Sequence, residues 1–130
     1  MPRYVILLHE TPLGSPRPTH WDLMFEDGDV LRTWALEELP EAGKAIRADR
    51  LPDHRSAYLT YEGRVSDDRG HVTRWDQGQF ESIARSDNSL RLQLRGEILD
   101  GHVCLTRLDQ KTDSWRFEFS ATQKSKPDDR

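Results

Sequence analysis

Alternating apolar and polar residues are the clearest pattern in this chain, and they predict short β-strands along most of its length. Residues 90–95 read LRLQLR, and residues 114–120 read SWRFEFS. Successive side chains of a strand point to opposite faces, so each segment offers one apolar face to a core. The same reasoning predicts strands over residues 3–9, 20–26, 30–36, 55–61, 71–76, 79–85, 97–99 and 102–108.

Turn signals separate these segments at short and regular intervals. Asp27-Gly28 and Asp100-Gly101 are typical of tight hairpins, and Gln77-Gly78 separates two more strands. One stretch, PEAGKAIRAD at residues 40–49, predicts a short helix because Pro40 stands near its start. Short strands at regular spacing with one crossover helix indicate an all-β sandwich or a closed barrel.

The composition is that of one folded domain. Of 130 residues, 32% are charged and 35% hydrophobic, and four Trp and four Phe supply bulky core groups. We expect a single domain over residues 1–121 and a flexible polar tail over residues 122–130.

The short apolar run that ends at His9 predicts a first strand rather than a signal peptide. A lone Cys104 excludes an internal disulfide, and we expect a cytoplasmic protein without a membrane partner.

The formal net charge of −4 argues against a protein that wraps duplex DNA by charge alone. Arginine is nevertheless concentrated in the middle of the chain. Guanidinium groups suit bidentate contacts with phosphate, although a set of solvated strand faces explains the same pattern. These arginines are Arg47, Arg50, Arg55, Arg64, Arg69 and Arg74.

A candidate metal site lies where the first two strands adjoin. His20, Asp22 and Met24 share one strand face, with His20 and Asp22 about 7 Å apart along the chain. His9 ends the preceding strand, so antiparallel pairing brings it to the same end. Two imidazoles and one carboxylate suit Mn²⁺, Fe²⁺ or Zn²⁺. The alternative is that these are ordinary surface or capping groups.

A candidate phosphate site follows later in the chain. His54 and Tyr58 are four residues apart and share a face of the strand predicted over residues 55–61 and its approach. An imidazole and a phenol can both donate hydrogen bonds to a phosphate oxygen. The alternative is that Tyr58 is a core aromatic residue with its hydroxyl at the rim. His71 and His102 have no matching partner, and we interpret them as structural.

Taken in order, these segments resemble the 3′-phosphoesterase domain of bacterial DNA ligase D. The resemblance runs from about Tyr4 to Phe119 and depends on the order and spacing of the motifs. The matching segments are His9, His20-Trp21-Asp22, GDVLRTWAL at 28–36, Asp53-His54, Tyr58, Tyr61-Glu62-Gly63, VTRWDQGQFE at 72–81, LQLRGEILDGHVCLTRL at 92–108, and a strand around Trp115.

The resemblance implies a compact antiparallel β-barrel of about eight strands with one short crossover helix. It also implies an enzyme that trims DNA 3′ ends with a divalent metal, typically Mn²⁺. Such an enzyme removes a 3′-terminal ribonucleoside and then the remaining 3′-phosphate. By position, His9, His20 and Asp22 would hold the metal, and His54 and Tyr58 would contact the scissile phosphate. Separate polymerase or ligase proteins are the implied partners.

The chain departs from the family pattern in three places, and two of these departures replace cations. Met24 stands where the family has an arginine, Glu37-Glu38 stands where the family has Pro-Lys, and the loop before His20 is longer. Arg17 in that loop is the candidate substitute for phosphate binding. We therefore expect weakened 3′-phosphoesterase activity on simple primer ends. The alternative function is a catalytically weakened nucleic-acid-binding or scaffold module in DNA end joining.

A third interpretation is a non-haem iron oxygenase. His20-x-Asp22 with a distant histidine also describes a facial triad, in which His71 or His102 would be the third ligand. The chain is short for that fold, so this interpretation ranks last.

Overall fold

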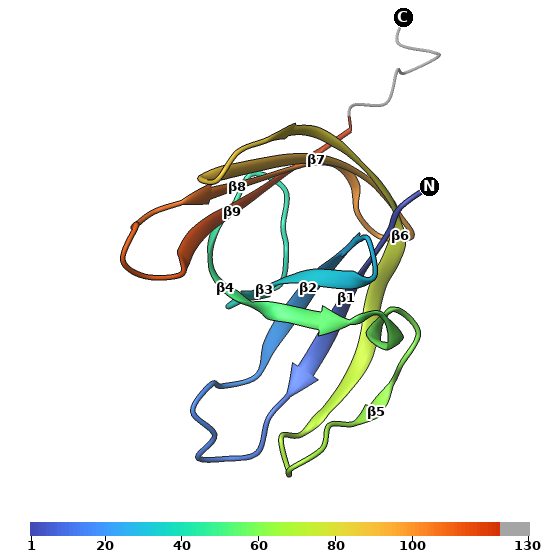
Figure 1. Ribbon diagram of the computed structural model, residues 1–130, viewed down its shortest axis with the longest axis vertical. Helices are drawn as coiled ribbons and strands as arrows, with labels where there is room; N and C mark the ends of the chain where they lie inside the picture. Colours follow the sequence, from blue (N-terminus) through green and yellow to red (C-terminus); the bar gives the residue numbers. More distant parts are fainter. Residues whose placement is uncertain (123–130) are drawn as a thin grey trace, which may run out of the picture.

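The computed structural model describes residues 1–122 and consists of β-strands joined by turns and loops (Figure 1). Within these residues the only helix is the single 3₁₀ turn η1, Ser56–Leu59. The strands are β1 Arg3–Glu10, β2 His20–Asp27, β3 Val30–Leu36, β4 Ala45–Arg55, β5 Gly63–Arg64, β6 His71–Arg85, β7 Ser89–Gly96, β8 Asp100–Arg107 and β9 Ser114–Ala121.

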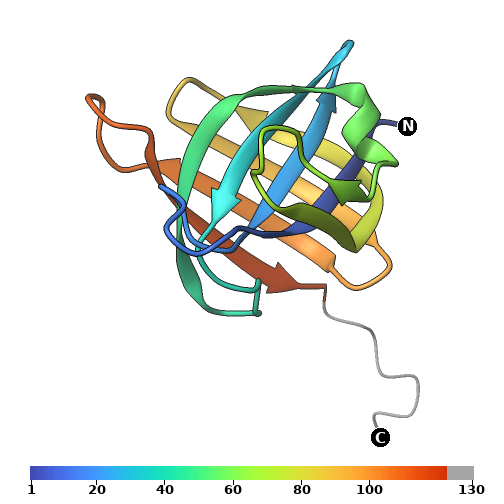
Figure 2. The same cartoon turned by 90° about the horizontal axis from the view of Figure 1, so that it is seen from below.

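Eight of the strands close into one antiparallel ring. The order is β1-β2-β3-β4-β9-β8-β7-β6, and β6 pairs back to β1, while the short β5 attaches to the start of β6. Figure 2 looks onto the side of the ring formed by β1–β3, with the segment between β4 and β6 lying in front of these strands. The expected closed antiparallel architecture of about eight strands is therefore confirmed.

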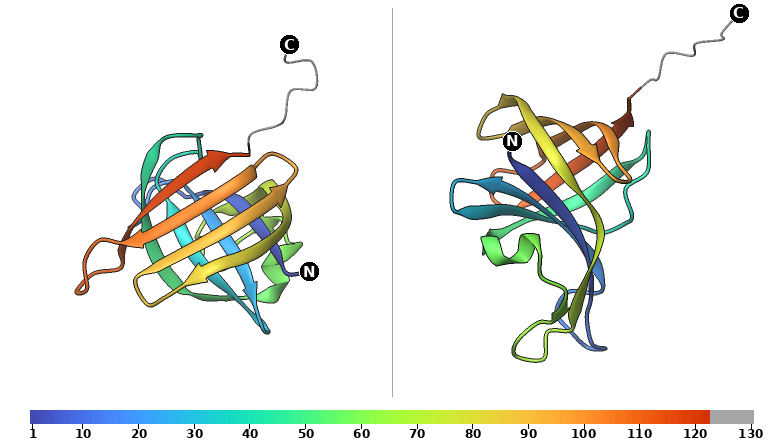
Figure 3. Two further views of the ribbon diagram at one scale, coloured as in Figure 1. Left: turned by 90° about the horizontal axis from the view of Figure 1, so that it is seen from above. Right: turned by 90° about the vertical axis from the view of Figure 1, so that its right-hand side faces the viewer.

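The two longest strands turn the corners of the ring. The start of β4 pairs with β9 and its end with β3; the start of β6 pairs with β1 and its end with β7. Figure 3 shows β6 curving from the β1 side to the β7 side. At this corner a Cβ on Gly78 would lie 2.2 Å from the backbone oxygen of Arg95, so only glycine fits.

Two apolar clusters explain why β1 and β2 each bury four consecutive residues. Alternate side chains of these strands, such as Ile6 and Leu23, fill the ring interior with Trp34, Trp115 and residues of β7–β9. The other side chains face outward and are covered by η1 and the following loop. This outer cluster consists of Val5, Leu7, Met24, Leu31, Leu59, Val65 and Val72. The cover over β1 and β2 forms one wall of the candidate site.

The predicted helix over residues 40–49 is wrong, because β4 begins at Ala45. Helix-forming residues at its start misled the prediction, but Ile46 and Ala48 alternate with exposed neighbours and pack inside the ring. Pairing with Phe117 and Trp115 of β9 buries these two side chains. Tertiary pairing has overridden a local helix preference.

Three further boundaries differ from the expectation. Residues 56–59 form η1 rather than part of a strand, and β6 runs through Gln77-Gly78 without a turn. Asp100-Gly101 lies within β8, and the preceding turn occupies residues 97–99 instead. That turn is fixed by Asp76, whose carboxylate accepts hydrogen bonds from the backbone N–H groups of Ile98 and Leu99.

The expected polar tail lies outside the described residues except for Thr122, whose backbone N–H donates to the carbonyl oxygen of Asp100. Across residues 1–122, no helix is long and apolar enough to span a membrane.

Candidate metal centre

The register of β1 against β2 brings the three predicted metal ligands together. His9 lies directly opposite His20, and Leu7 lies opposite Asp22. The two imidazole rings have centroids 4.8 Å apart. One ligand atom from each of His9, His20 and Asp22 lies within 4.8 Å of the other two. Period-2 alternation places all three on the outward face, beneath the cover formed by residues 56–70.

Asp22 is the buried centre of this cluster, with 3% of its side chain exposed. Its Oδ2 hydrogen-bonds to His9 Nδ1 at 3.1 Å. Its Oδ1 lies 2.9 Å from His20 Nε2, but the two groups are not aligned for a hydrogen bond and Oδ1 has no hydrogen-bond partner. A buried carboxylate oxygen without a donor is costly unless another positive group approaches it.

The charges around Asp22 keep it ionised. Burial by itself favours the neutral acid, but the neighbouring imidazoles of His20 and His9 outweigh burial and lower the pKa of Asp22 to about 2. In turn, the hydrogen bond to Asp22 raises the pKa of His9 above its ordinary value. Asp22 is therefore an anion at neutral pH, which is the form that binds a metal.

Backbone carbonyls orient both histidine rings. His20 Nδ1 lies 2.9 Å from the carbonyl oxygen of Pro18, and His9 Nε2 lies 2.8 Å from that of Arg69. A carbonyl oxygen only accepts, so each of these nitrogens carries a proton. The opposite nitrogen of each ring faces Asp22, and a bound metal would take the place of the proton through which His9 Nδ1 hydrogen-bonds to Asp22. Metal-bound histidines characteristically donate their second ring N–H to a carbonyl oxygen in this way, so the cluster fits a divalent metal.

A cleft of about 240 Å³ opens directly beside this cluster. It is lined by residues from β1, β2, the end of β4, η1 and the loop before β6. The lining residues are His9, Asp22, Met24, Asp53, His54, Arg55, Tyr58, Val65, Arg69 and Val72. Two of the three predicted phosphate-binding residues, His54 and Tyr58, thus lie in the same cleft as two of the predicted metal ligands.

His54 and Tyr58 lie side by side, as expected, but not because they share the face of one strand. His54 is near the end of β4 and Tyr58 is in η1, so they do not share a strand face. The 3₁₀ turn nevertheless places their rings edge to face at 5.7 Å. His54 Nδ1 donates to the carbonyl oxygen of Pro52 at 2.9 Å. Its Nε2 is thereby left for another partner.

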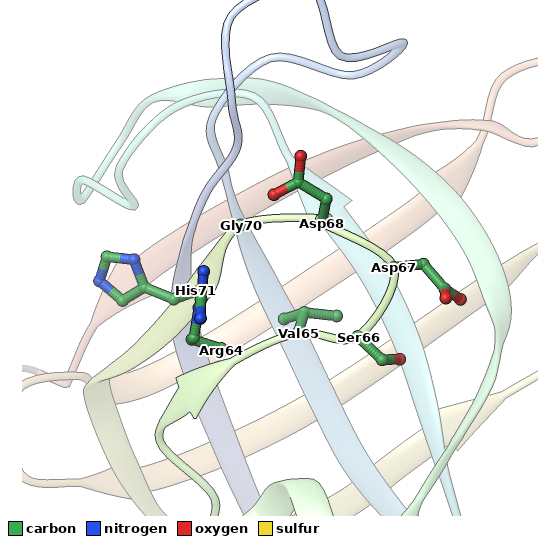
Figure 4. Close-up of a pocket in the computed structure, with 7 residues that line it drawn as sticks. All are labelled: Arg64, Val65, Ser66, Asp67, Asp68, Gly70 and His71. Atoms are coloured by element: carbon green, nitrogen blue, oxygen red, sulfur yellow. The ribbon is translucent and has the colours of Figure 1, made fainter.

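A separate hollow of about 640 Å³ belongs to the loop that joins β5 to β6. Figure 4 shows Asp67 and Asp68 at the turn of this loop, with their carboxylates pointing away from each other. Divergent carboxylates do not form a metal site, so this hollow offers no ligand group like that of His9, His20 and Asp22.

The two distant histidines do not join the cluster. Half-exposed His71 lies 3.4 Å from Glu10, and His102 lies on β8 opposite Gln93 and Ser120. Among residues 1–122, His9, His20 and Asp22 form the one group of three such ligands. The oxygenase interpretation, which needs His71 or His102, gains no support.

Comparison with known proteins identifies the family of the chain. The sequence pattern of the DNA ligase D 3′-phosphoesterase domain matches residues 13–107. The chain belongs to this family. A search among curated proteins found no match. Membership in the ligase D phosphoesterase family associates the chain with DNA end repair. The matched region contains His20, Asp22, His54 and Tyr58, whereas His9 precedes it and joins the site through strand pairing.

The departures from the ligase D pattern have different positions in the structure. Met24 lines the cleft but is only 1% exposed, and it packs in the outer apolar cluster. Glu37 and Glu38 are absent from the cleft lining. Glu37 lies 3.5 Å from Arg47 and Glu38 lies 2.6 Å from Lys44. Of the two departures in residue type, only Met24 alters the cleft itself.

Arg17 does not line the cleft, because it forms an ion pair with Asp49 at 2.8 Å. The cations of the cleft are Arg55 and Arg69, which the sequence did not single out. Their signal was the concentration of arginine in the middle of the chain. Sequence alone gave no means of deciding which of those arginines turns toward the metal ligands.

Proposed function

We propose that this chain is a metal-dependent phosphoesterase that removes a 3′-terminal ribonucleoside, and then the 3′-phosphate, from DNA ends. The observation that carries the proposal is the conjunction of two parts. A carboxylate and two oriented imidazoles form a metal-type cluster, and the adjoining cleft contains His54 and Tyr58. Family membership supplies the DNA context. Mn²⁺ is the proposed metal.

The proposed reaction is two hydrolyses at one phosphorus atom. In the first, a water oxygen bonds to phosphorus, the bond to the ribonucleoside 5′-oxygen breaks, and that oxygen takes a proton. In the second, the bond to the DNA 3′-oxygen breaks, which leaves a 3′-hydroxyl and inorganic phosphate. A divalent metal supplies charge neutralisation and a water of lowered pKa.

The residues of the chain have distinct proposed roles. Asp22, His9 and His20 hold the metal. His54 Nε2 and the Tyr58 hydroxyl face the phosphate as donors, and a protonated His54 is the proton source for the leaving oxygen. Arg55 and Arg69 line the same cleft and offset the negative charge of the phosphate.

The test is cleavage of a primer–template whose primer ends in one ribonucleotide, with Mn²⁺ present and then removed by a chelator. We expect Mn²⁺-dependent loss of the ribonucleoside followed by loss of the 3′-phosphate. Product analysis by mass distinguishes the two steps. A chain that binds Mn²⁺ and DNA but leaves the primer intact would contradict the proposal.

A binding or scaffold module is the second candidate function, and the position of Met24 favours it. A buried thioether offers phosphate neither charge nor a hydrogen-bond donor. We therefore expect weak activity on simple primer ends. Replacing Met24 with arginine should raise the single-turnover rate about tenfold, which corresponds to about 1.4 kcal/mol.

The matched control for this change is Met24→Leu, which keeps the apolar packing and should leave the rate unchanged. Equal rates for the natural protein and Met24→Arg would show that Arg55 or Arg69 already supplies the cation. If the natural protein and the Met24→Arg variant are both inert while metal still binds, the scaffold function is the correct one.

A further inference from the structure

A second hollow of about 260 Å³ continues from the candidate metal cleft. Arg55 and Tyr58 line both spaces. The remaining lining residues come from η1 and the segment that leads into the next loop: Ala57, Tyr61, Arg64 and Ser66. Two aromatic residues and two arginines therefore line a space beside the cleft.

Tyr61 is held in one position although its ring is 39% exposed. Its hydroxyl donates to the carbonyl oxygen of Arg64, and its ring lies edge to face with Tyr58 at 5.8 Å. Gly63, with φ of 138°, leaves room for the phenol, since a Cβ there would lie 3.0 Å from the hydroxyl. An exposed aromatic ring that is already ordered loses little entropy when a ligand stacks on it.

The two arginines of this hollow are not committed elsewhere. Within residues 1–122, neither Arg55 nor Arg64 makes a side-chain hydrogen bond or ion pair, whereas nearby Arg69 and Arg74 do make side-chain hydrogen bonds. Unpaired guanidinium groups beside a fixed aromatic ring are the elements of single-stranded nucleic-acid binding. The groups that stack a base and contact its phosphates are therefore both present.

We propose that this hollow is a nucleotide subsite that takes the unpaired terminal nucleoside of the strand whose phosphate lies in the metal cleft. Its base stacks on Tyr61, and Arg55 and Arg64 contact the one phosphate that joins this nucleoside to the strand. The assignment of the strand end rests on the proposed function. Asp67 and Asp68 lie beyond Arg64 (Figure 4) and repel a longer polyanion, so the subsite holds one nucleoside.

The first experiment measures binding without catalysis. A short fluorescein-labelled oligodeoxynucleotide that ends in a 3′-ribonucleotide is titrated in chelator by anisotropy, beside the same strand with an abasic 3′ end. Removing the base should weaken binding to the natural protein about tenfold. In Tyr61→Ala the same removal should change binding less than twofold. Tyr61→Phe retains the ring and should behave as the natural protein.

The second measurement tests the arginines by salt dependence. Arg64→Gln should reduce the slope of log K against log salt by about 0.7, the value for one phosphate of a single strand. The control is Arg91→Gln, an exposed arginine of β7 on the opposite part of the ring, which should not change the slope. This readout remains available if Tyr61→Ala does not fold.

The outcomes separate this subsite from the proposed reaction. If Tyr61→Ala slows removal of the ribonucleoside but not of a 3′-phosphate, the leaving nucleoside occupies the hollow. If base removal weakens binding equally in the natural protein and Tyr61→Ala, the subsite is wrong even when Mn²⁺-dependent cleavage is normal. If cleavage is absent but the base-dependent binding follows Tyr61, the subsite holds and the proposed reaction fails.

Discussion

Replacing Asp22 with asparagine should abolish Mn²⁺ binding and, with it, phosphoesterase activity. Asp22 is the ionised centre of the cluster, with a pKa of about 2 and an oxygen that lacks a hydrogen-bond partner. Loss of residues that only orient metal ligands typically reduces affinity roughly 10–100-fold. Loss of the anionic ligand itself should exceed that, so we expect at least about a hundredfold loss of Mn²⁺ affinity by calorimetry.

The β-fold should survive this change, because asparagine keeps the size of the side chain, and circular dichroism checks that it does. Glu10→Gln is the matched control. It makes the same acid-to-amide change next to His9, but Glu10 is exposed, faces His71 and does not line the cleft. If His71→Ala or His102→Ala removes Mn²⁺ binding and His9→Ala does not, the metal site has been placed wrongly.

Replacing Asp76 with alanine should destabilise the protein by about 3–5 kcal/mol, a large share of the roughly 5–15 kcal/mol typical of a domain. Asp76 is buried and accepts three hydrogen bonds. Tyr4 donates at 2.6 Å, and the backbone N–H groups of Ile98 and Leu99 donate at 2.8 and 3.1 Å. Alanine leaves the backbone N–H groups of Ile98 and Leu99 without this acceptor, and leaves the Tyr4 hydroxyl only the carbonyl oxygen of Leu99 at 3.5 Å. Urea denaturation measures the free energy of unfolding.

A double-mutant cycle with Tyr4→Phe isolates one of these bonds. Burial, and then the hydrogen bond to Asp76, raise the pKa of Tyr4 above its ordinary value, so the phenol remains a neutral donor. Tyr4→Phe should cost about 1–2 kcal/mol in the natural protein and much less beside Asp76→Ala. Equal costs in both backgrounds would show that the bond contributes nothing. Asp27→Ala, which breaks an exposed ion pair with Arg85, should cost under about 1 kcal/mol.

The sequence predicted those strands in which apolar and polar residues alternate, because this alternation indicates that one face is buried. Val30–Leu36 has the expected bounds, and the strands that begin the chain and carry LRLQLR and SWRFEFS differ by one or two residues. The prediction failed where pairing with a distant strand overrides the local sequence signal. Residues 40–49 have helix formers and yet pair with β9, and Asp100-Gly101 resembles a turn and yet lies in β8.

In the candidate site, too, some residues were placed by local geometry and others only by the tertiary fold. Period-2 alternation placed His20 and Asp22 on one face, and hairpin pairing brought His9 beside them, because both follow from local geometry. His54 and Tyr58 were chosen correctly as neighbours, but through a strand that does not exist. Their contact depends on η1, which forms where the chain leaves β4 and folds over the outer cluster.

The sequence by itself determined an all-β chain, the pairing of its first strands and the three residues of the candidate metal cluster, since each depends on contacts between neighbours in the chain. Only the tertiary structure decided which cations enter the cleft. Arg55 and Arg69 lie there, while Arg17 pairs with Asp49 and Met24 is buried in an apolar cluster. The reason is that a long side chain is placed by the segments folded against it. Here those segments lie far apart in the sequence.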